Sequence, residues 1–107
     1  MHDKETPIVG TIGLRIRADV GLDVSGATKV ELHYHKPDGT YGFFTGAYEL
    51  YPDPVDGEDK HTVVYTTLSA NDIDQAGRWT FQAYVEMGSN KFWGTPDKTE
   101  RFMEKLS

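Results

Sequence analysis

The chain has 107 residues, 17 of them acidic and 11 basic, and a formal net charge of -6. This length fits one domain. The absence of cysteine excludes disulfide bonds and thiolate chemistry and favours folding in a reducing compartment. A negative charge without a Lys/Arg run argues against a nucleic-acid partner, and no apolar stretch reaches the ~20 residues of a membrane helix.

The chain is expected to begin with a flexible, polar lead-in over residues 1–7, followed by a single domain over residues 8–107. The lead-in lacks the apolar run of a signal peptide, which disfavours a cell-surface adhesion module.

Alternation of apolar and polar residues predicts half-buried strands over residues 12–20 and 29–35. The second strand ends at a turn containing Pro37 and Gly39, because proline presets φ and glycine accepts the positive φ that follows. A third strand is expected over residues 40–50. Both of its faces carry aromatic rings, so its period does not show which face is buried.

An acidic loop is predicted over residues 52–59, because Pro52 and Pro54 cannot donate to a sheet ladder. A fourth strand is expected to follow over residues 63–68.

One short helical turn is predicted over residues 69–77, capped by Ser69 and closed by Gly77. Residues 78–87 alternate most regularly and predict the strongest strand. A hairpin at residues 88–90 and a return strand at 91–94 follow. The tail at residues 98–106 fits a final strand, with a short helix as the alternative.

These elements predict an all-β fold, an immunoglobulin-like antiparallel β-sandwich of about seven strands with one short helical turn. Residues 74–81 are similar to the corner at which an immunoglobulin strand begins, with Trp79 in the aromatic position. Because an indole has no phenolic hydroxyl, the hydrogen bond of a tyrosine corner is not expected here.

Three segments carry a resemblance to a known family: VSGATKVEL at residues 24–32, KPDGT at 36–40, and VVYTTLSANDIDQAGRWTFQAY at 63–84. They resemble the immunoglobulin-like domain of tailed-phage structural proteins, and the N-terminal domain of phage baseplate upper proteins in particular. The likeness covers residues 12–93. Its signatures are turns and strands, which specify a fold more closely than a function.

The resemblance implies a non-enzymatic virion protein of the tail, baseplate or neck, without a cofactor, that is assembled in the cytoplasm of the bacterial host. Its partners would be other virion proteins or further copies of itself, and neither nucleic acid nor membrane. The family domain usually precedes a long trimerisation or receptor-binding region, whereas this sequence stops at Ser107. We therefore expect either a free-standing small virion protein or a module with its own partner surface. Truncation after residue 97 is expected to weaken assembly, because the last strand would close an edge.

Aromatic residues are more numerous than one core face needs, and exposed rings can fill a partner's hot spot or stack on a sugar. The alternative function is therefore a carbohydrate-binding module, and a third interpretation is that the rings only cover the open end of the sandwich. The partner-contact candidates are Tyr41, Phe43, Tyr48, Tyr51 and Trp93.

Two clusters contain metal-ligating residue types. The carboxylates of the acidic loop would be the ligands if calcium bound, although a solvated loop is the favoured interpretation. Glu31, His33 and His35 share one strand face and could hold a metal, although a polar outer sheet face is favoured. We predict no metal, no cofactor and no catalytic residue; the calcium candidates are Asp53, Asp56, Glu58 and Asp59.

Overall fold

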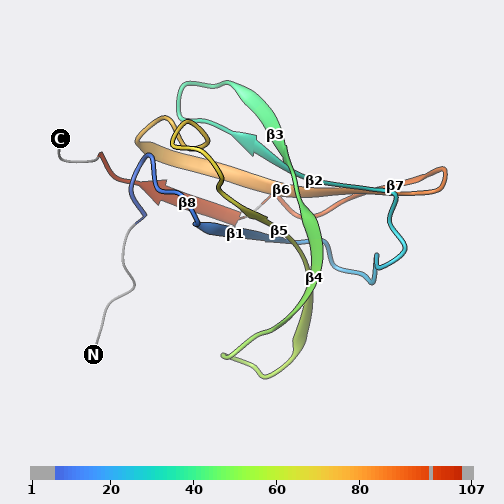
Figure 1. Cartoon of the computed structure of the whole chain (residues 1–107). Coiled ribbons are helices and arrows are strands. Elements are labelled where there is room, and N and C mark those ends of the chain that lie inside the picture. Colours follow the sequence, from blue (N-terminus) through green and yellow to red (C-terminus); the bar gives the residue numbers. More distant parts are fainter. Residues whose placement is uncertain (1–6, 97, 105–107) are drawn as a thin grey trace.

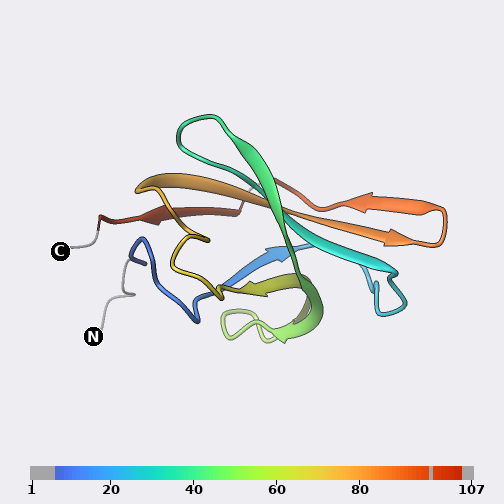
Figure 2. The ribbon, with the colours of Figure 1, turned by 45° about the horizontal axis from the view of Figure 1, so that its top comes forward.

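The computed structural model describes residues 7–96 and 98–104. Within these residues eight strands form two antiparallel sheets, and no helix is present, which confirms the predicted all-β sandwich. Figure 2 shows the sheets as an upper and a lower layer. The strands are β1 (Arg15–Asp19), β2 (Lys29–His35), β3 (Tyr41–Thr45), β4 (Ala47–Pro52), β5 (Asp59–Thr66), β6 (Gly77–Met87), β7 (Asn90–Trp93) and β8 (Lys98–Phe102).

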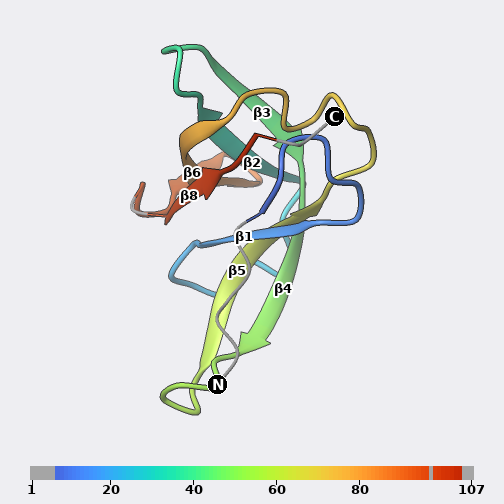
Figure 3. The same cartoon turned by 90° about the vertical axis from the view of Figure 1, so that its left-hand side faces the viewer.

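One sheet has the order β1-β5-β4 and the other the order β3-β2-β6-β7, with β8 also paired to β6. The chain changes sheet between β1 and β2, between β3 and β4, and between β5 and β6, and the other consecutive strands are neighbours or share a sheet. In the view of Figure 3, β1, β5 and β4 form one layer, and β2, β6 and β8 lie in the other.

Strand β6 organises the larger sheet, because it is 11 residues long and has neighbours on both sides. It pairs with β2 on one side, while β7 and β8 share the other side along its length. Its strict alternation places Trp79, Phe81, Ala83 and Val85 in the core, each with no exposed surface. Complete burial of a large apolar side chain contributes about 1.5–3 kcal/mol, so this strand supplies much of the core.

The core continues across both sheets as a single cluster of buried side chains. Leu32 of β2 and Val63 of β5 are completely buried, and Phe102 of β8 is 1% exposed. The predicted final strand is therefore confirmed over residues 98–102, while residues 105 and 106 lie outside the described part. The remaining members of the cluster are Ile16, Ala18, Val20, Val24 and Ile73.

The predicted third strand proves to be two strands that belong to different sheets. The chain passes from β3 to β4 at Gly46, and Figure 1 shows the resulting green ribbon crossing from one layer to the other. A Cβ atom at Gly46 would lie 2.8 Å from Val63 Cγ1, so this close crossing requires glycine. The rings on both faces of the segment are explained by this change of sheet.

The segment over residues 69–77 contains a turn and no helix. Asp72 N donates to Ser69 O at 3.1 Å, and Ser69 Oγ accepts from Asn71 N, as an N-cap would. The backbone does not continue into a helix because the Asp72 carboxylate accepts hydrogen bonds from the Leu68 amide at 2.8 Å and from the Tyr65 hydroxyl at 2.6 Å.

Strand ends also differ from the expectation. β1 begins at Arg15, and Ile12 before it is exposed; β5 ends at Thr66, and Leu68 after it is 77% exposed. The predicted lead-in lies outside the described residues except for Pro7, whose carbonyl accepts from Met103 N at 2.9 Å. The described residues include no helix long and apolar enough to span a membrane.

Candidate functional site

The outer face of the larger sheet combines aromatic rings with neutral polar side chains. Because the even-numbered residues of β2 face the core, His33 and His35 face outward. His33 lies opposite Phe43 on one side and Gln82 on the other, and His35 lies opposite Tyr41 and Thr80. Two rows of side chains thus run across β3, β2 and β6.

His33 lies at the centre of an aromatic cluster. Its ring centroid is 5.3 Å from that of Phe43, 5.0 Å from that of Trp93 and 5.5 Å from that of Tyr84. Its Nε2 atom is 2.8 Å from Glu31 Oε1. Packing and this hydrogen bond together fix the orientation of the imidazole.

Tyr84 is covered by these neighbours and donates its hydroxyl proton to the Glu86 carboxylate. That hydrogen bond, together with burial, raises the pKa of Tyr84 to about 12. The phenol therefore remains protonated at neutral pH, and this part of the face carries no ionised tyrosine.

His35 and Tyr41 form a second, simpler pair at the other end of the face. Their rings are stacked with centroids 4.4 Å apart and planes inclined by 8°. Tyr41 remains 76% exposed because it lies on the edge strand.

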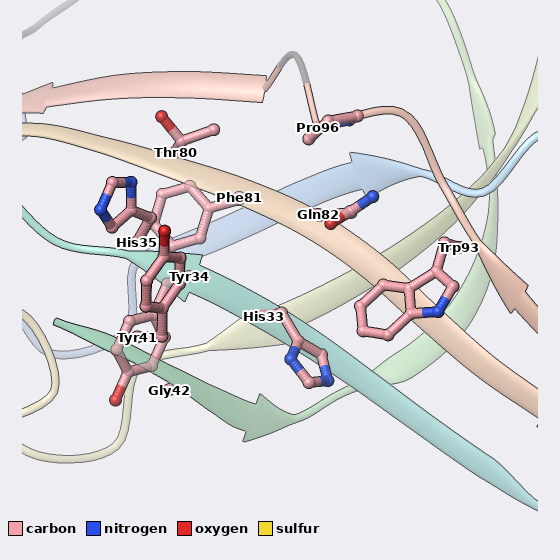
Figure 4. Close-up of a pocket in the computed structure, with 10 residues that line it drawn as sticks. All are labelled: His33, Tyr34, His35, Tyr41, Gly42, Thr80, Phe81, Gln82, Trp93 and Pro96. Atoms are coloured by element: carbon pink, nitrogen blue, oxygen red, sulfur yellow. The ribbon is translucent and has the colours of Figure 1, made fainter. Parts of the chain in front are cut away.

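A pocket of about 320 Å³ lies between the two groups of rings. Figure 4 shows Trp93 and the His35–Tyr41 pair at opposite ends of it, with Pro96 beside Gln82 and Thr80. Gln82 Nε2 donates to Gly94 O at 2.7 Å, which ties the pocket to the segment that follows β7. The lining residues are His33, Tyr34, His35, Tyr41, Gly42, Thr80, Phe81, Gln82, Trp93 and Pro96.

The close approach of the segment after β7 depends on Gly94. A Cβ atom at this position would lie 2.1 Å from Asp19 O, so no other residue fits without displacing backbone. Gly94 thereby sets the position from which the chain continues to Pro96 at the pocket.

The five predicted partner-contact residues fall into two groups. Tyr41, Phe43 and Trp93 lie together on the outer face of the larger sheet, and each is more than half exposed. Tyr48 and Tyr51 lie on β4 in the other sheet. Only the first group contributes to this face.

The tyrosines of β4 are engaged within the protein. The Tyr48 hydroxyl and His61 Nδ1 share a hydrogen bond of 2.7 Å, and the Tyr48 ring is half-buried against the core. The Arg17 guanidinium lies 4.1 Å from the centroid of the Tyr51 ring, a cation–π contact. Both rings therefore have partners in their own sheet.

The calcium candidates lie in the loop at the tip of the β4–β5 hairpin, which extends from the body of the sandwich in Figure 1. Asp53 Oδ1 accepts from Val55 N at 2.8 Å, and Lys60 Nζ lies 2.9 Å from Asp56 Oδ2. The amide of Glu58, and then Lys60, lower the pKa of Asp56. Asp59 is the first residue of β5.

The described residues hold no group of three or more side chains placed to bind one metal ion. Within the second candidate cluster, Glu31 and His33 are hydrogen-bonded to each other while His35 stacks on Tyr41. The histidines therefore point to different partners although they share a face.

Sequence reasoning gave no role at a site to six of the ten lining residues: Thr80, Gln82, Pro96, Tyr34, Gly42 and Phe81. A signal for Thr80 and Gln82 was present, because they alternate with the apolar residues of the most regular strand and therefore face outward. Pro96 carried no signal, since its position depends on how the chain passes Gly94.

No protein-family model matches this chain, and no curated protein or solved structure shows significant similarity to it.

Proposed function

We propose that this protein is a non-enzymatic structural component of a tailed-phage particle, in the tail, baseplate or neck, which docks to neighbouring copies of itself through the free edge of β3. The resemblance of residues 24–40 and 63–84 to immunoglobulin-like domains of phage structural proteins supports the setting. The protein would then be located in the virion after assembly in the host cytoplasm.

The composition of the edge strands is the observation that carries the docking proposal. Proteins protect exposed sheet edges with charged residues, proline or a covering segment. β1, β7 and β8 each carry charged residues, and β4 contains Glu49 and ends at Pro52. β3, with the sequence YGFFT, contains neither charge nor proline and is the unprotected edge among those the structure describes.

The backbone of β3 also presents hydrogen-bonding groups to the outside. Gly46 N donates to Val30 O at 3.0 Å, and Lys36 N donates to Thr40 O at 2.8 Å. In an antiparallel ladder, hydrogen-bonded pairs alternate with non-hydrogen-bonded pairs. The even-numbered residues of β3 therefore bond to β2, and the amide and carbonyl groups of Tyr41, Phe43 and Thr45 point away from the sheet.

A second copy satisfies these groups most directly, because an antiparallel pair of β3 strands is self-complementary about a twofold axis. In that ladder Phe43 lies opposite Phe43 of the other copy, and Tyr41 lies opposite Thr45. Backbone hydrogen bonds would supply affinity and the exposed rings specificity, as in other interactions by strand addition.

The chemistry of the outer face supports a function without catalysis. The residues that line the pocket include no carboxylate, lysine or arginine. The acidic groups with lowered pKa values lie elsewhere, with Asp38 bonded to Thr40 and Glu49 to Arg17. An acid–base pair of perturbed groups, which enzymes place in a cleft, is thus not assembled at the pocket.

Light scattering after size exclusion tests the docking proposal. Wild-type protein is expected at twice its chain mass of 12.0 kDa. Thr45→Pro removes an outward amide at a position where an edge strand tolerates proline, and Phe43→Lys places two like charges opposite each other. Both variants are expected to be monomeric with an unchanged circular dichroism spectrum.

Disulfide trapping gives the register of the interface. Because the chain contains no cysteine, Phe43→Cys introduces a single thiol, and the Cα atoms of opposed residues in such a ladder lie ~5.5 Å apart, within disulfide range. Phe43→Cys should form a cross-linked dimer under mild oxidation. Val55→Cys, at a position 92% exposed in the β4–β5 loop, is the control for random collision. Monomeric wild-type protein at every concentration, or equal cross-linking of the two variants, would refute the proposal.

A further inference from the structure

We propose that the pocket on the outer face of the larger sheet binds a neutral saccharide. This site differs from the docking edge, because docking through β3 relies on backbone groups of that strand, whereas the pocket is lined by residues of β2, β3, β6, β7 and the segment after it; Tyr41 belongs to both. The volume of about 320 Å³ is at the lower end of the range of roughly 300–1,000 Å³ for small-molecule sites.

The charge of the pocket selects the class of ligand. Its lining contains no carboxylate, lysine or arginine side chain that would balance a charged ligand. The carboxylate of Glu31 is hydrogen-bonded to the lining residue His33, so this carboxylate already has a partner. A phosphate, a uronic acid or an ammonium group would be desolvated without an opposite charge, which is unfavourable. The pocket therefore suits a ligand without formal charge.

The polar groups of the pocket match a hydroxyl-rich ligand. Thr80 offers a hydroxyl, and His35 offers ring nitrogens on the adjacent strand. Gln82 uses its amide nitrogen for Gly94 O, which directs its side-chain oxygen to another donor. Such groups accept and donate in turn, as sugar hydroxyls require.

The ends of the pocket supply apolar surface for the C–H face of a sugar ring. Trp93 is 55% exposed and is supported from below by His33 and Tyr84. Tyr41 is supported by its stacking on His35 at the opposite end. Rigid aromatic groups lose little conformational entropy on binding, so a ligand that contacts both ends meets a preformed surface.

Tryptophan fluorescence gives a direct test, because the two tryptophans differ in environment. Trp79 is completely buried, whereas Trp93 is 55% exposed at the pocket. Full-length protein is titrated with methyl glucoside, lactose and the disaccharide of N-acetylglucosamine up to about 10 mM, a range that detects millimolar affinity. At least one of these neutral probes is expected to produce a saturable change that Trp93→Phe removes.

Calorimetry on variants separates the pocket from the rest of the surface. Tyr41→Ala and Thr80→Val should each weaken binding of the same sugar by about tenfold, the equivalent of one lost contact. Tyr51→Ala, on the outer face of the other sheet, should leave the affinity unchanged. Glucuronic acid should bind about tenfold more weakly than its neutral counterpart, because the pocket contains no lysine or arginine.

Three results would overturn the saccharide proposal. The first is the absence of a response to all three neutral sugars. The second is an affinity that Tyr41→Ala and Thr80→Val leave unchanged. The third is that these two variants alter only self-association in light scattering, which would assign the pocket to a protein interface.

Discussion

Trp79 is both the largest buried side chain and a hydrogen-bond donor to the preceding turn. It has no exposed surface, and its Nε1 atom donates to Gln75 O at 3.1 Å, four residues upstream. A tyrosine corner makes an equivalent bond through its hydroxyl. A tryptophan cannot make the phenolic bond, and here the indole N–H bonds to the backbone in its place.

Replacement of Trp79 by phenylalanine should destabilise the protein by about 1–3 kcal/mol, since it removes the indole donor, leaves Gln75 O unpaired and reduces packed volume. Urea denaturation measures the change. Trp93→Phe, at an exposed position, is the matched control and should shift stability by less than about 0.5 kcal/mol. Equal effects of the two substitutions would contradict the importance of the corner.

Asp72 and Tyr65 form a second, partly buried polar contact in the β5–β6 connection. Burial alone would raise the pKa of Asp72, but hydrogen bonds from Tyr65 and from the amides of Leu68 and Ser69 outweigh burial and lower it. Burial and the bond to Asp72 raise the pKa of Tyr65 to about 12. In the folded protein this hydrogen bond therefore favours a neutral Tyr65 phenol and an ionised Asp72 carboxylate.

The pH dependence follows from the sign of the tyrosine shift. The unfolded phenol loses its proton near pH 10, its ordinary value, whereas folded Tyr65 retains it to about pH 12. Its contribution is therefore complete below pH 10 and is lost as the pH rises from 10 to 12. Tyr65→Phe should reduce the decline in stability over this range in urea denaturation. A decline as steep as in wild-type protein would show that Tyr65 does not cause it.

At the scale of elements, β3 and β4 form one ribbon that serves both sheets. The division at Gly46 gives each sheet an edge strand from the same segment. β4 contains Glu49, which pairs with Arg15 and Arg17 of β1, whereas β3 carries no charged residue, and among the described residues no strand lies beside its outer edge. The two halves of one ribbon therefore differ in their readiness to associate.

β8 is expected to be indispensable to the fold itself. It pairs with β6 and inserts Phe102 into the core beside Trp79, with ring centroids 5.8 Å apart. Truncation after residue 97 should therefore unfold the protein, a stronger effect than the weakened assembly inferred from sequence. Phe102→Ala should lower stability by about 3–5 kcal/mol, as measured by urea denaturation.

Met103→Ala is the control for Phe102→Ala. Met103 is 45% exposed, and it connects to the N-terminal segment through its backbone. Its truncation should change stability by less than about 0.5 kcal/mol.

A chain truncated after residue 97 that still folds would contradict the prediction for β8, because it would show that the edge of β6 can be closed in another way.

Sequence patterns predicted the strands that have a clear period. They failed where contacts between residues far apart in the sequence determine the local structure. Residues 29–35 and 78–87 were placed because alternation alone identifies half-buried strands. The change of sheet at Gly46 was missed because it depends on the distance to Val63. The segment at residues 69–77 was predicted to be a helical turn because the sequence did not reveal that the Tyr65 hydroxyl would donate to the Asp72 carboxylate.

At the scale of the whole molecule, the candidate site was only partly predictable. Tyr41, Phe43 and Trp93 were identified because aromatic residues are more numerous than one core face needs, but Tyr48 and Tyr51 were grouped with them although they lie in the other sheet. Sequence order does not show which sheet a strand joins, so it cannot bring together residues from β3, β6 and the segment after β7. The pocket exists only after the sheet is assembled.

The docking edge and the pocket are compatible in one assembly. A twofold axis through the paired β3 strands would be perpendicular to the sheet, so the outer faces of both copies would lie on the same side. Two pockets would then face one surface. Such an arrangement would increase avidity for a repetitive glycan without a new contact.

Amide hydrogen exchange of β3, followed residue by residue by NMR at low and high protein concentration, tests the docking edge most directly. We expect the amides of Tyr41, Phe43 and Thr45 to exchange rapidly in dilute solution and to become protected at high concentration. The amides of Gly42 and Phe44, which bond to β2, should be protected throughout. Rapid exchange of the three outward amides at every concentration would show that no neighbour pairs with this edge.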